Sequence, residues 1–136
     1  AAVVTGSSVG VGRTVAMSLA EKGCRVVINY SRSRADAEEA VNLCRAKGVE
    51  AIMVQADVSS DNDCRRLIQT AVDTFGRLDV LVNNAAVTKF IPFSDLEALT
   101  EEIWLKVLRT NLTGAFFCSR AAVPHMQRAG EGAIVD

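Results

Sequence analysis

The sequence predicts an α/β fold, in which a parallel sheet is covered by helices on both faces. Two observations favour this class: short apolar runs alternate with segments of helical periodicity, and the loops between them are short and contain glycine. Parallel strands need a crossover between them, usually a helix, so this alternation indicates parallel pairing. The chain has 136 residues and is 49% hydrophobic, which suits one domain with a buried core. No linker divides it, and we expect residues 1–136 to form a single domain.

Five runs rich in β-branched residues are expected to form strands. Residues 1–5 are almost entirely apolar, as in a strand that is buried on both faces. The other runs cover residues 25–30, 50–57, 78–85 and 132–136. The last run stops where the sequence stops, so the fifth strand is expected to be cut short.

Four segments with helical periodicity lie between these runs. The first is predicted to bury Val11, Val15 and Leu19 and to end at Lys22-Gly23. Residues 59–63 should cap the third segment, and Thr100 the fourth. The second and third segments carry apolar stripes, namely Ala37, Ala40, Val41 and Cys44, and then Cys64, Leu67, Ile68, Ala71, Val72 and Phe75. Right-handed crossovers between the strands favour a Rossmann-like doubly wound parallel sheet in three αβα layers.

Composition excludes several classes of function. The formal net charge is -1 and no basic block is present, so we expect no nucleic-acid partner and no membrane partner. The four cysteines are isolated and the chain has one histidine, so we expect no metal site. Buried, reduced thiols indicate a cytoplasmic protein.

Three glycines follow the first strand in the stretch VVTGSSVGVGR, residues 3–13. Gly6, Gly10 and Gly12 are spaced G-x-x-x-G-x-G, which differs from the commoner G-x-G-x-x-G. Glycines at a helix start let backbone N–H groups approach a pyrophosphate, and the helix N-terminus adds partial positive charge. A tight turn with close helix–strand packing needs the same residues, so the loop alone leaves both interpretations open.

Together with two later motifs, this loop resembles the short-chain dehydrogenase/reductase family. Asp57-Val58 follows the third strand and residues 83–86, Asn-Asn-Ala-Ala, follow the fourth, and the resemblance runs the length of the chain. It implies that a nicotinamide dinucleotide lies across the carboxyl ends of the strands. The residues expected to hold its pyrophosphate are Thr5, Gly6, Ser7, Ser8, Gly10, Val11 and Gly12. Asp57 would hydrogen-bond the adenine amino group, Val58 would pack on the ring, and Asn83, Ala85 and Ala86 would line the adenine ribose and nicotinamide side.

Simpler structural roles remain open for these residues. Asp57 could cap the next turn, and Asn83 and Asn84 could satisfy backbone groups of neighbouring strands. The family usually has glycine where Ala86 stands, and we expect the added methyl to tighten the pocket without abolishing binding.

The end of the second strand bears on the choice of cofactor. An acidic residue there accepts hydrogen bonds from a ribose 2′-hydroxyl and repels a 2′-phosphate. Here the strand ends with Tyr30, Ser31, Arg32 and Ser33, and no carboxylate precedes Asp36. Arg32 can clamp a phosphate, and the serines add hydroxyl donors. Because this stretch resembles that of family members that use NADP, we expect NADP(H) rather than NAD(H).

Two features weaken that expectation. NADP-using members often carry a basic residue where Val9 stands, and Arg13 is predicted to point to solvent. Arg32 could also be a solvated charge at the start of a helix.

Hydride transfer to a carbonyl requires a proton donor close to the developing alkoxide. In the family this is a tyrosine with a lysine four residues later, aided by a serine and by an asparagine that anchors a proton-relay water. Asn111 matches that asparagine. It falls in line with Val107 and Ala115 on a face of apolar character, where a buried amide needs partners. Alternatively, residues 109–114 form a helix break and Asn111 caps the next segment.

The sequence holds a cofactor half-site without its acid. The only tyrosine is Tyr30, no Tyr-x-x-x-Lys occurs, and His125 is expected at the surface. The last residue, Asp136, stands where the family usually has asparagine. Three explanations compete: part of a longer polypeptide, which we favour; a fragment that binds nucleotide without chemistry; or a structural partner that completes its sheet with another chain.

The expected function is that of an NADP(H)-dependent oxidoreductase interconverting a small-molecule carbonyl and an alcohol, with a 3-oxoacyl group as one candidate. The alternative is a non-catalytic nucleotide-binding or interaction module. The resemblance also implies a homodimer or homotetramer formed through the helices after the fourth and fifth strands. Trp104, Phe116 and Phe117 could pack in that interface or in the core.

Overall fold

Five parallel strands form one sheet in the order β3-β2-β1-β4-β5 in the computed structural model, which describes residues 1–136. The strands are β1 (Ala2–Val4), β2 (Val26–Tyr30), β3 (Ala51–Gln55), β4 (Val80–Val82) and β5 (Ala133–Val135). β1 is central and pairs in register with both β2 and β4. From β1 the chain adds β2 and β3 on one side of the sheet, and it then adds β4 and β5 on the other side of β1. This is the predicted doubly wound Rossmann-like order.

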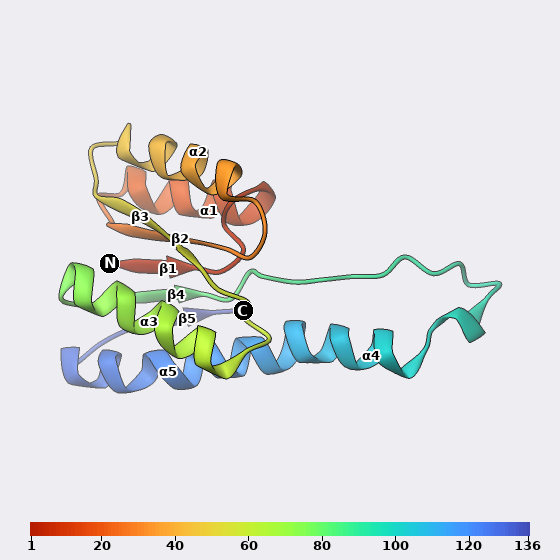
Figure 1. Ribbon diagram of the computed structural model, residues 1–136. Coiled ribbons are helices and arrows are strands. Elements are labelled where there is room, and N and C mark those ends of the chain that lie inside the picture. Colours follow the sequence, from red (N-terminus) through yellow and green to blue (C-terminus); the bar gives the residue numbers. More distant parts are fainter.

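Helices cover both faces of this sheet, as Figure 1 shows. α1 (Gly10–Glu21) and α2 (Arg34–Arg45) lie on one face, and α3 (Asp61–Phe75) and α5 (Gly114–Ala129) lie on the other. Between β4 and α5 the chain forms a short 3-10 turn, η1 (Leu96–Ala98), and then α4 (Glu101–Leu108). The prediction of three αβα layers is confirmed.

Residues 109–113 do not break the helix. They form a π-helical turn, η2 (Arg109–Thr113), which joins α4 to α5 without an interruption. The helix predicted from Thr100 toward Met126 is therefore one long rod with a π turn in its middle, and Thr100 caps its start through a hydrogen bond from Ile103 N–H. Such π turns inside α-helices occur frequently at functional sites.

Two apolar clusters fill the space between the sheet and its helices. On the α1–α2 side, eleven buried residues include Val4, Ile28 and Val41. On the α3–α5 side, sixteen buried residues include Leu67 and Leu81. The stripes predicted for the second and third helices are confirmed, since their members are buried or packed against these clusters.

The stripe predicted for the first helix is wrong at Val11, which is 73% exposed, while Val15 and Leu19 pack partly against the apolar cluster. The fully buried residues of α1 are Gly12, Ala16 and Ala20. These small residues let α1 lie close to the sheet, so its innermost positions are not the ones that hold the larger apolar side chains.

β5 and α4 are more exposed to solvent than the other strands and helices. All three residues of β5 are exposed, and α4 contains no buried residue.

Three of the four cysteines are buried and all four are free thiols. None of the helices combines the length and apolarity that a membrane crossing demands.

Candidate functional site

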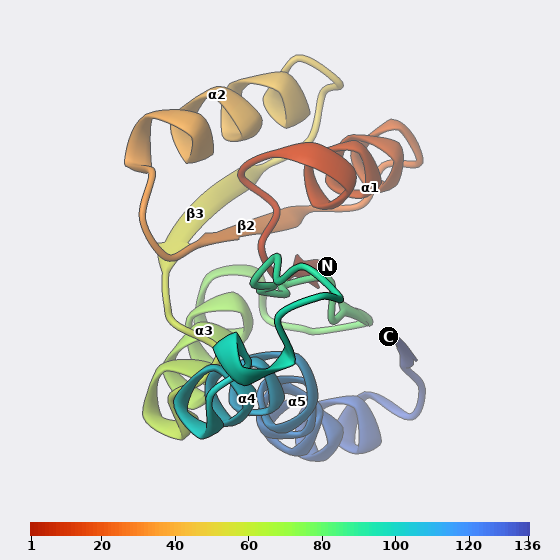
Figure 2. The same cartoon turned by 90° about the vertical axis from the view of Figure 1, so that its right-hand side faces the viewer.

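A cavity of about 640 Å³ opens at the carboxyl ends of the strands. Figure 2 views the molecule from this end. The cavity is lined by the loops after β1, β2, β3 and β4, by the end of α4 and by the π turn η2. The strand order reverses between β1 and β4. In doubly wound sheets, ligands bind in the crevice at the carboxyl ends of the strands where this reversal occurs. The volume lies within the roughly 300–1,000 Å³ typical of small-molecule and cofactor sites.

The three glycines of the first loop have different structural roles. A Cβ on Gly6 would lie 2.9 Å from the Ala85 Cα, and one on Gly12 would lie 2.4 Å from the Asn84 Nδ2. Both glycines therefore permit a close approach between the loop and the end of β4. Gly10 has open space around it, but its φ of +59° lies in the left-handed region that glycine adopts without strain.

The start of α1 differs from the starts of the next three helices. Ser33, Ser60 and Thr100 each cap their helix with a side-chain oxygen, whereas Val9 at the start of α1 offers no such cap. The first turn of α1 also contains no acidic residue. The backbone N–H groups of residues 9–12 donate no hydrogen bond within the chain. Uncapped N–H groups at a helix start are suited to an anion such as phosphate.

Two predicted pyrophosphate ligands have buried side chains instead. The Thr5 hydroxyl accepts hydrogen bonds from the backbone N–H groups of Asn84 and Ala85, at 3.0 and 2.9 Å. The Ser7 hydroxyl donates to the Val4 carbonyl at 2.6 Å and accepts from the Asn29 N–H. Both side chains fix the loop. Of the predicted set, Gly6 and Ser8 line the cavity. The other members do not line it, namely Thr5, Ser7, Gly10, Val11 and Gly12.

Asn29, which the sequence analysis did not select, organises three strand ends. Its side-chain carbonyl accepts from Gly6 N–H at 3.0 Å, and its amide donates to the carbonyls of Val54 and Ala56. The side chain is buried and lines the cavity. A polar residue inside an otherwise apolar strand was the available signal.

The end of β2 forms the wall predicted to select the cofactor. Tyr30, Ser31, Arg32 and Ser33 all line the cavity, and the Ser33 hydroxyl accepts from Asp36 N–H and so caps α2. Arg32 is exposed and has neither a hydrogen bond nor an ion pair. Its guanidinium is therefore free to meet a ligand.

The prediction that Arg13 points to solvent is wrong. Its Nε donates to the Ser8 carbonyl at 2.7 Å, and its terminal nitrogens reach the Glu39 carboxylate and the Asp36 carbonyl. Because Ser8 and Asp36 line the cavity, Arg13 ties together two of its walls from behind.

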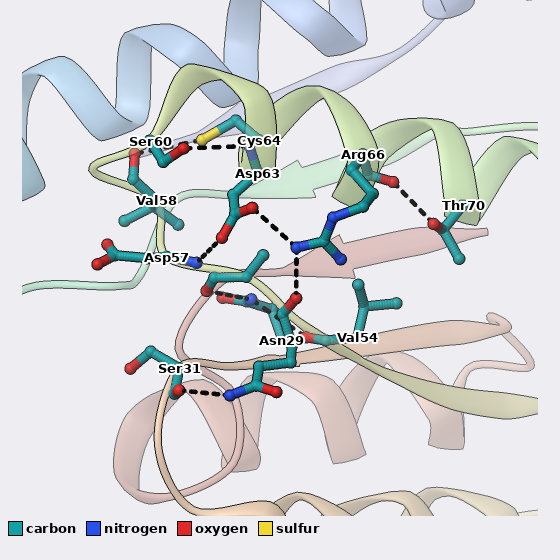
Figure 3. A network of polar contacts seen from close by, with 12 residues as sticks. Asn29, Ser31, Val54, Asp57, Val58, Ser60, Asp63, Cys64, Arg66 and Thr70 are labelled. Carbon is teal, nitrogen blue, oxygen red and sulfur yellow. Dashed lines mark hydrogen bonds and ion pairs between the residues drawn. The ribbon is translucent and has the colours of Figure 1, made fainter.

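Asp57 and Val58 line the cavity after β3. The Asp57 carboxylate accepts from Ser59 N–H at 2.9 Å, which is the turn-capping role left open by the sequence. Its backbone N–H donates to Asp63, and Figure 3 shows the Asp57 carboxylate on the side away from Asp63. The other carboxylate oxygen, Oδ2, therefore remains able to accept a hydrogen bond from a ligand. The hydrogen bond from Asp57 N–H, helped by Arg66, holds the pKa of Asp63 below its ordinary value.

The residues after β4 divide between structure and cavity. Ala85 and Ala86 line the cavity, and Asn83 does not. The Asn83 amide donates to Ser119 and Asp136, which ties β4 to α5 and to the end of the chain. Asn84 lines the cavity and donates to the carbonyls of Thr5 and Gly6, so it has the structural role that the sequence left open.

Asn111 lies in the π turn and is exposed, so the expectation of a buried amide is wrong. Its side-chain carbonyl accepts from Val87 N–H at 2.8 Å, and its amide donates to the Val87 carbonyl at 3.0 Å. It thus holds the segment after β4 against the rod. Both hydrogen-bond partners of the Asn111 amide are backbone groups of Val87.

The end of α4 and the π turn η2 contribute residues that were not predicted from the sequence. Lys106 of α4 and Arg109 and Thr110 of η2 line the cavity. Arg109 Nε donates to the Ser59 carbonyl at 2.9 Å, which fixes the rod to the loop after β3. A Cβ on Gly114 would lie 2.9 Å from the Val58 carbonyl oxygen, so glycine permits this close packing.

Other reactive side chains lie outside the cavity. His125 contacts Arg128 near the far end of α5, and burial, aided by that positive charge, lowers its pKa. Its side chain is half-buried rather than fully at the surface. The hydrogen bond that the Cys118 thiol donates to Cys64, together with burial, raises the pKa of Cys118.

Comparison with known proteins gives this arrangement a family. The sequence pattern of the short chain dehydrogenase family matches residues 1–136. A protein assigned as ketoacyl reductase 2 of the granaticin polyketide synthase of Streptomyces violaceoruber is 49% identical over 99% of this chain and 53% of its own length. The 3-oxoacyl-[acyl-carrier-protein] reductase FabG of Staphylococcus epidermidis is 42% identical over 99% of this chain and 54% of its own.

Solved structures agree with the sequence match. The crystal structure of a protein assigned as a short-chain dehydrogenase/reductase from Burkholderia xenovorans superimposes with a TM-score of 0.91 at 32% identity, over 94% of this chain and 53% of that one. The chain spans about half the length of the relatives it matches. With a match along its full length and the same fold, the chain belongs to the short-chain dehydrogenase/reductase family.

Proposed function

We propose that this chain is the cofactor-binding half of an NADP(H)-dependent reductase that acts on the carbonyl of a small molecule. The observation that carries the proposal is the uncapped start of α1 beside the cavity at the strand ends. Free backbone N–H groups and a helix N-terminus together suit a diphosphate.

The lining residues fit the rest of such a dinucleotide. Asp57 and Val58 offer a carboxylate and an apolar surface for adenine, and Ala85 and Ala86 leave space at the end of β4. Arg32 is unpaired at the end of β2, where a 2′-phosphate would lie. Asp36 is the first carboxylate after the end of β2, and it lies in the first turn of α2.

The reaction we propose is the reduction of a ketone to an alcohol. The bound nicotinamide would supply the hydride. The chain described here would bind and orient the dinucleotide, and Asn111 would fix the segment around Val87 beside it. We place the tyrosine–lysine proton donor outside residues 1–136, because these residues contain no Tyr-x-x-x-Lys and their only tyrosine, Tyr30, lies at the end of β2, two residues before Arg32.

The names of two relatives support a proposal for the substrate class. One is named a ketoacyl reductase and the other a 3-oxoacyl-[acyl-carrier-protein] reductase. We therefore propose a 3-oxoacyl thioester as the substrate of the whole protein.

Titration with NADPH and NADH tests the cofactor assignment directly. Ligand fluorescence should show saturable NADPH binding to this chain, and Arg32→Glu should weaken it about tenfold or more, since a charge-assisted contact becomes a repulsion. Lys22→Glu makes the same charge change at the other end of α1 and should leave binding unchanged. Absence of saturable binding by either dinucleotide would contradict the proposal, and tighter NADH binding that ignores Arg32 would contradict the choice of NADP(H).

We also propose that α4 and α5 form a homo-oligomer interface. Trp104 and Phe116 are 54% and 57% exposed, so they do not belong to the core, whereas Phe117 packs partly against it. Single apolar side chains at a surface are ordinary, but Trp104, Leu105, Leu108, Leu112 and Phe116 lie along one rod. Light scattering over a range of concentrations should show association, and a strictly monomeric mass would contradict it.

A further inference from the structure

A second cavity of about 500 Å³ adjoins the dinucleotide cavity. Its lining comes from the segment after β4 and from α4, and it shares Arg32, Val87 and Lys106 with the first cavity. Figure 2 shows that the segment after β4 passes in front of the strand ends, between α4 and the helices of the other layer. Arg32 and Lys106 therefore stand at the boundary of the two cavities, and they come from different layers of the fold.

The basic side chains at this boundary have no partners. Of the fifteen lysines and arginines, eleven make a hydrogen bond or an ion pair within the chain. The four that make neither are Lys22, Arg32, Lys89 and Lys106. Three of these, all except Lys22, line the second cavity. Unpaired cations gathered from separate elements indicate a place for an anion.

Lys106 is placed to act together with Arg32. It lies in the last turn of α4, and it lines the dinucleotide cavity as well as the second one. Glu102, one turn earlier on the same helix, faces the second cavity but makes no ion pair with Lys106. Lys89 lines the second cavity alone.

We propose that Lys106 is a second specificity-determining residue for the 2′-phosphate of NADP(H), and that it closes on this phosphate from α4 opposite Arg32. This inference rests on the proposed cofactor-binding function. A dianionic phosphate offers several acceptor oxygens, so a guanidinium on one side and an ammonium on the other can both donate to it. The position of Lys106 on the rod also makes the preference for NADP(H) depend on how α4 is held.

Two small ligands that differ by one phosphate provide the sharpest test. Adenosine 2′,5′-bisphosphate and adenosine 5′-monophosphate should be titrated calorimetrically against the wild-type chain and against Lys106→Met, which keeps the apolar stem and removes the charge. The variant should bind the bisphosphate about tenfold more weakly and the monophosphate within about twofold of wild type. The salt dependence of bisphosphate binding should become less steep, because one phosphate contact is lost.

Lys22→Met is the matched control, since Lys22 is also unpaired but lines neither cavity, and it should leave both affinities within about twofold of wild type. Equal weakening of both ligands in Lys106→Met would overturn the inference, because it would show a contact to the shared adenosine part or a displaced α4. Unchanged binding of the bisphosphate would overturn it as well. Failure of the proposed function looks different: the wild-type chain would then bind neither ligand.

Discussion

The glycine loop and the α4–α5 rod line opposite sides of one cavity, but they are held in different ways. The loop is fixed by buried polar side chains, with Thr5 and Asn29 each 2% exposed and both bonded to backbone groups of neighbouring strands. α4 contains no buried residue, and the rod is tied to the rest of the site through Arg109 and Asn111. Substitutions in the loop should therefore reduce stability and binding together, whereas substitutions at the exposed positions of α4 should leave the stability of the folded chain nearly unchanged.

Gly12→Val should produce the largest effect of the series. The new side chain would occupy the space of the Asn84 amide and the Gly6 carbonyl, so the loop or β4 must move. We expect a loss of about 3 kcal/mol in the free energy of unfolding, as for severe overpacking, together with the loss of NADPH binding. Urea denaturation measures the first and ligand fluorescence the second. The control is Val11→Ala at the exposed neighbouring position, and equal stability of the two variants would contradict the packing role of Gly12.

Asn29→Ala should have the next largest effect. It removes three hydrogen bonds and leaves Gly6 N–H and the carbonyls of Val54 and Ala56 without this partner. We expect a loss of about 2 kcal/mol in unfolding free energy, since unsatisfied buried groups keep their desolvation cost. Asn42→Ala, on the exposed side of α2, makes the same chemical change and should be close to neutral. A neutral Asn29→Ala would show that the three strand ends hold together without it.

Lowering the pH should remove a smaller contribution, that of the Asp63 carboxylate to the free energy of unfolding. The pKa of this carboxyl is lowered by the hydrogen bond from Asp57 N–H and by Arg66, so the folded state favours the ionised form. Its stabilising effect is fully present above the ordinary aspartate pKa of about 3.9 and is lost as the pH falls through the lower folded-state value. For a half-exposed group we expect about 1 kcal/mol. Chemical denaturation across this pH range should show a flatter acid limb for Asp63→Asn than for wild type, and identical limbs would contradict the assignment.

Trp104→Ser should change the stability of the folded monomer least. The side chain is half-exposed and makes no polar contact, so the unfolding free energy should stay within about 0.5 kcal/mol of wild type. Because Trp104 is the only tryptophan, unfolding must be followed by circular dichroism rather than by intrinsic fluorescence. A loss above 2 kcal/mol in a monomeric sample would show that the rod is held as firmly as the loop.

The predictions from the sequence were most accurate for helix faces and helix caps, which depend on residues close together in the chain. The stripes of α2 and α3 and the caps at Ser60 and Thr100 follow from residue spacing alone, and the structure confirms them. The prediction was incomplete at α1, where Val11 is exposed and the fully buried positions hold the small residues Gly12, Ala16 and Ala20 that a close approach to the sheet requires. The predictions failed at Arg13 and Asn111, whose partners come from α2 and from the segment after β4.

The sequence by itself determined the α/β alternation, the positions of the five strands to within three residues and the glycines beside the first helix, since these depend on short-range backbone and side-chain preferences. Only the tertiary structure decided which polar residues serve the framework and which line the cavity. Thr5, Ser7 and Asn84 turn toward neighbouring strands, and Arg32 and Lys106 remain unpaired at its rim. The physical reason is that a polar side chain takes the partner that folding brings within hydrogen-bonding distance, and those partners lie up to 80 residues away in the chain.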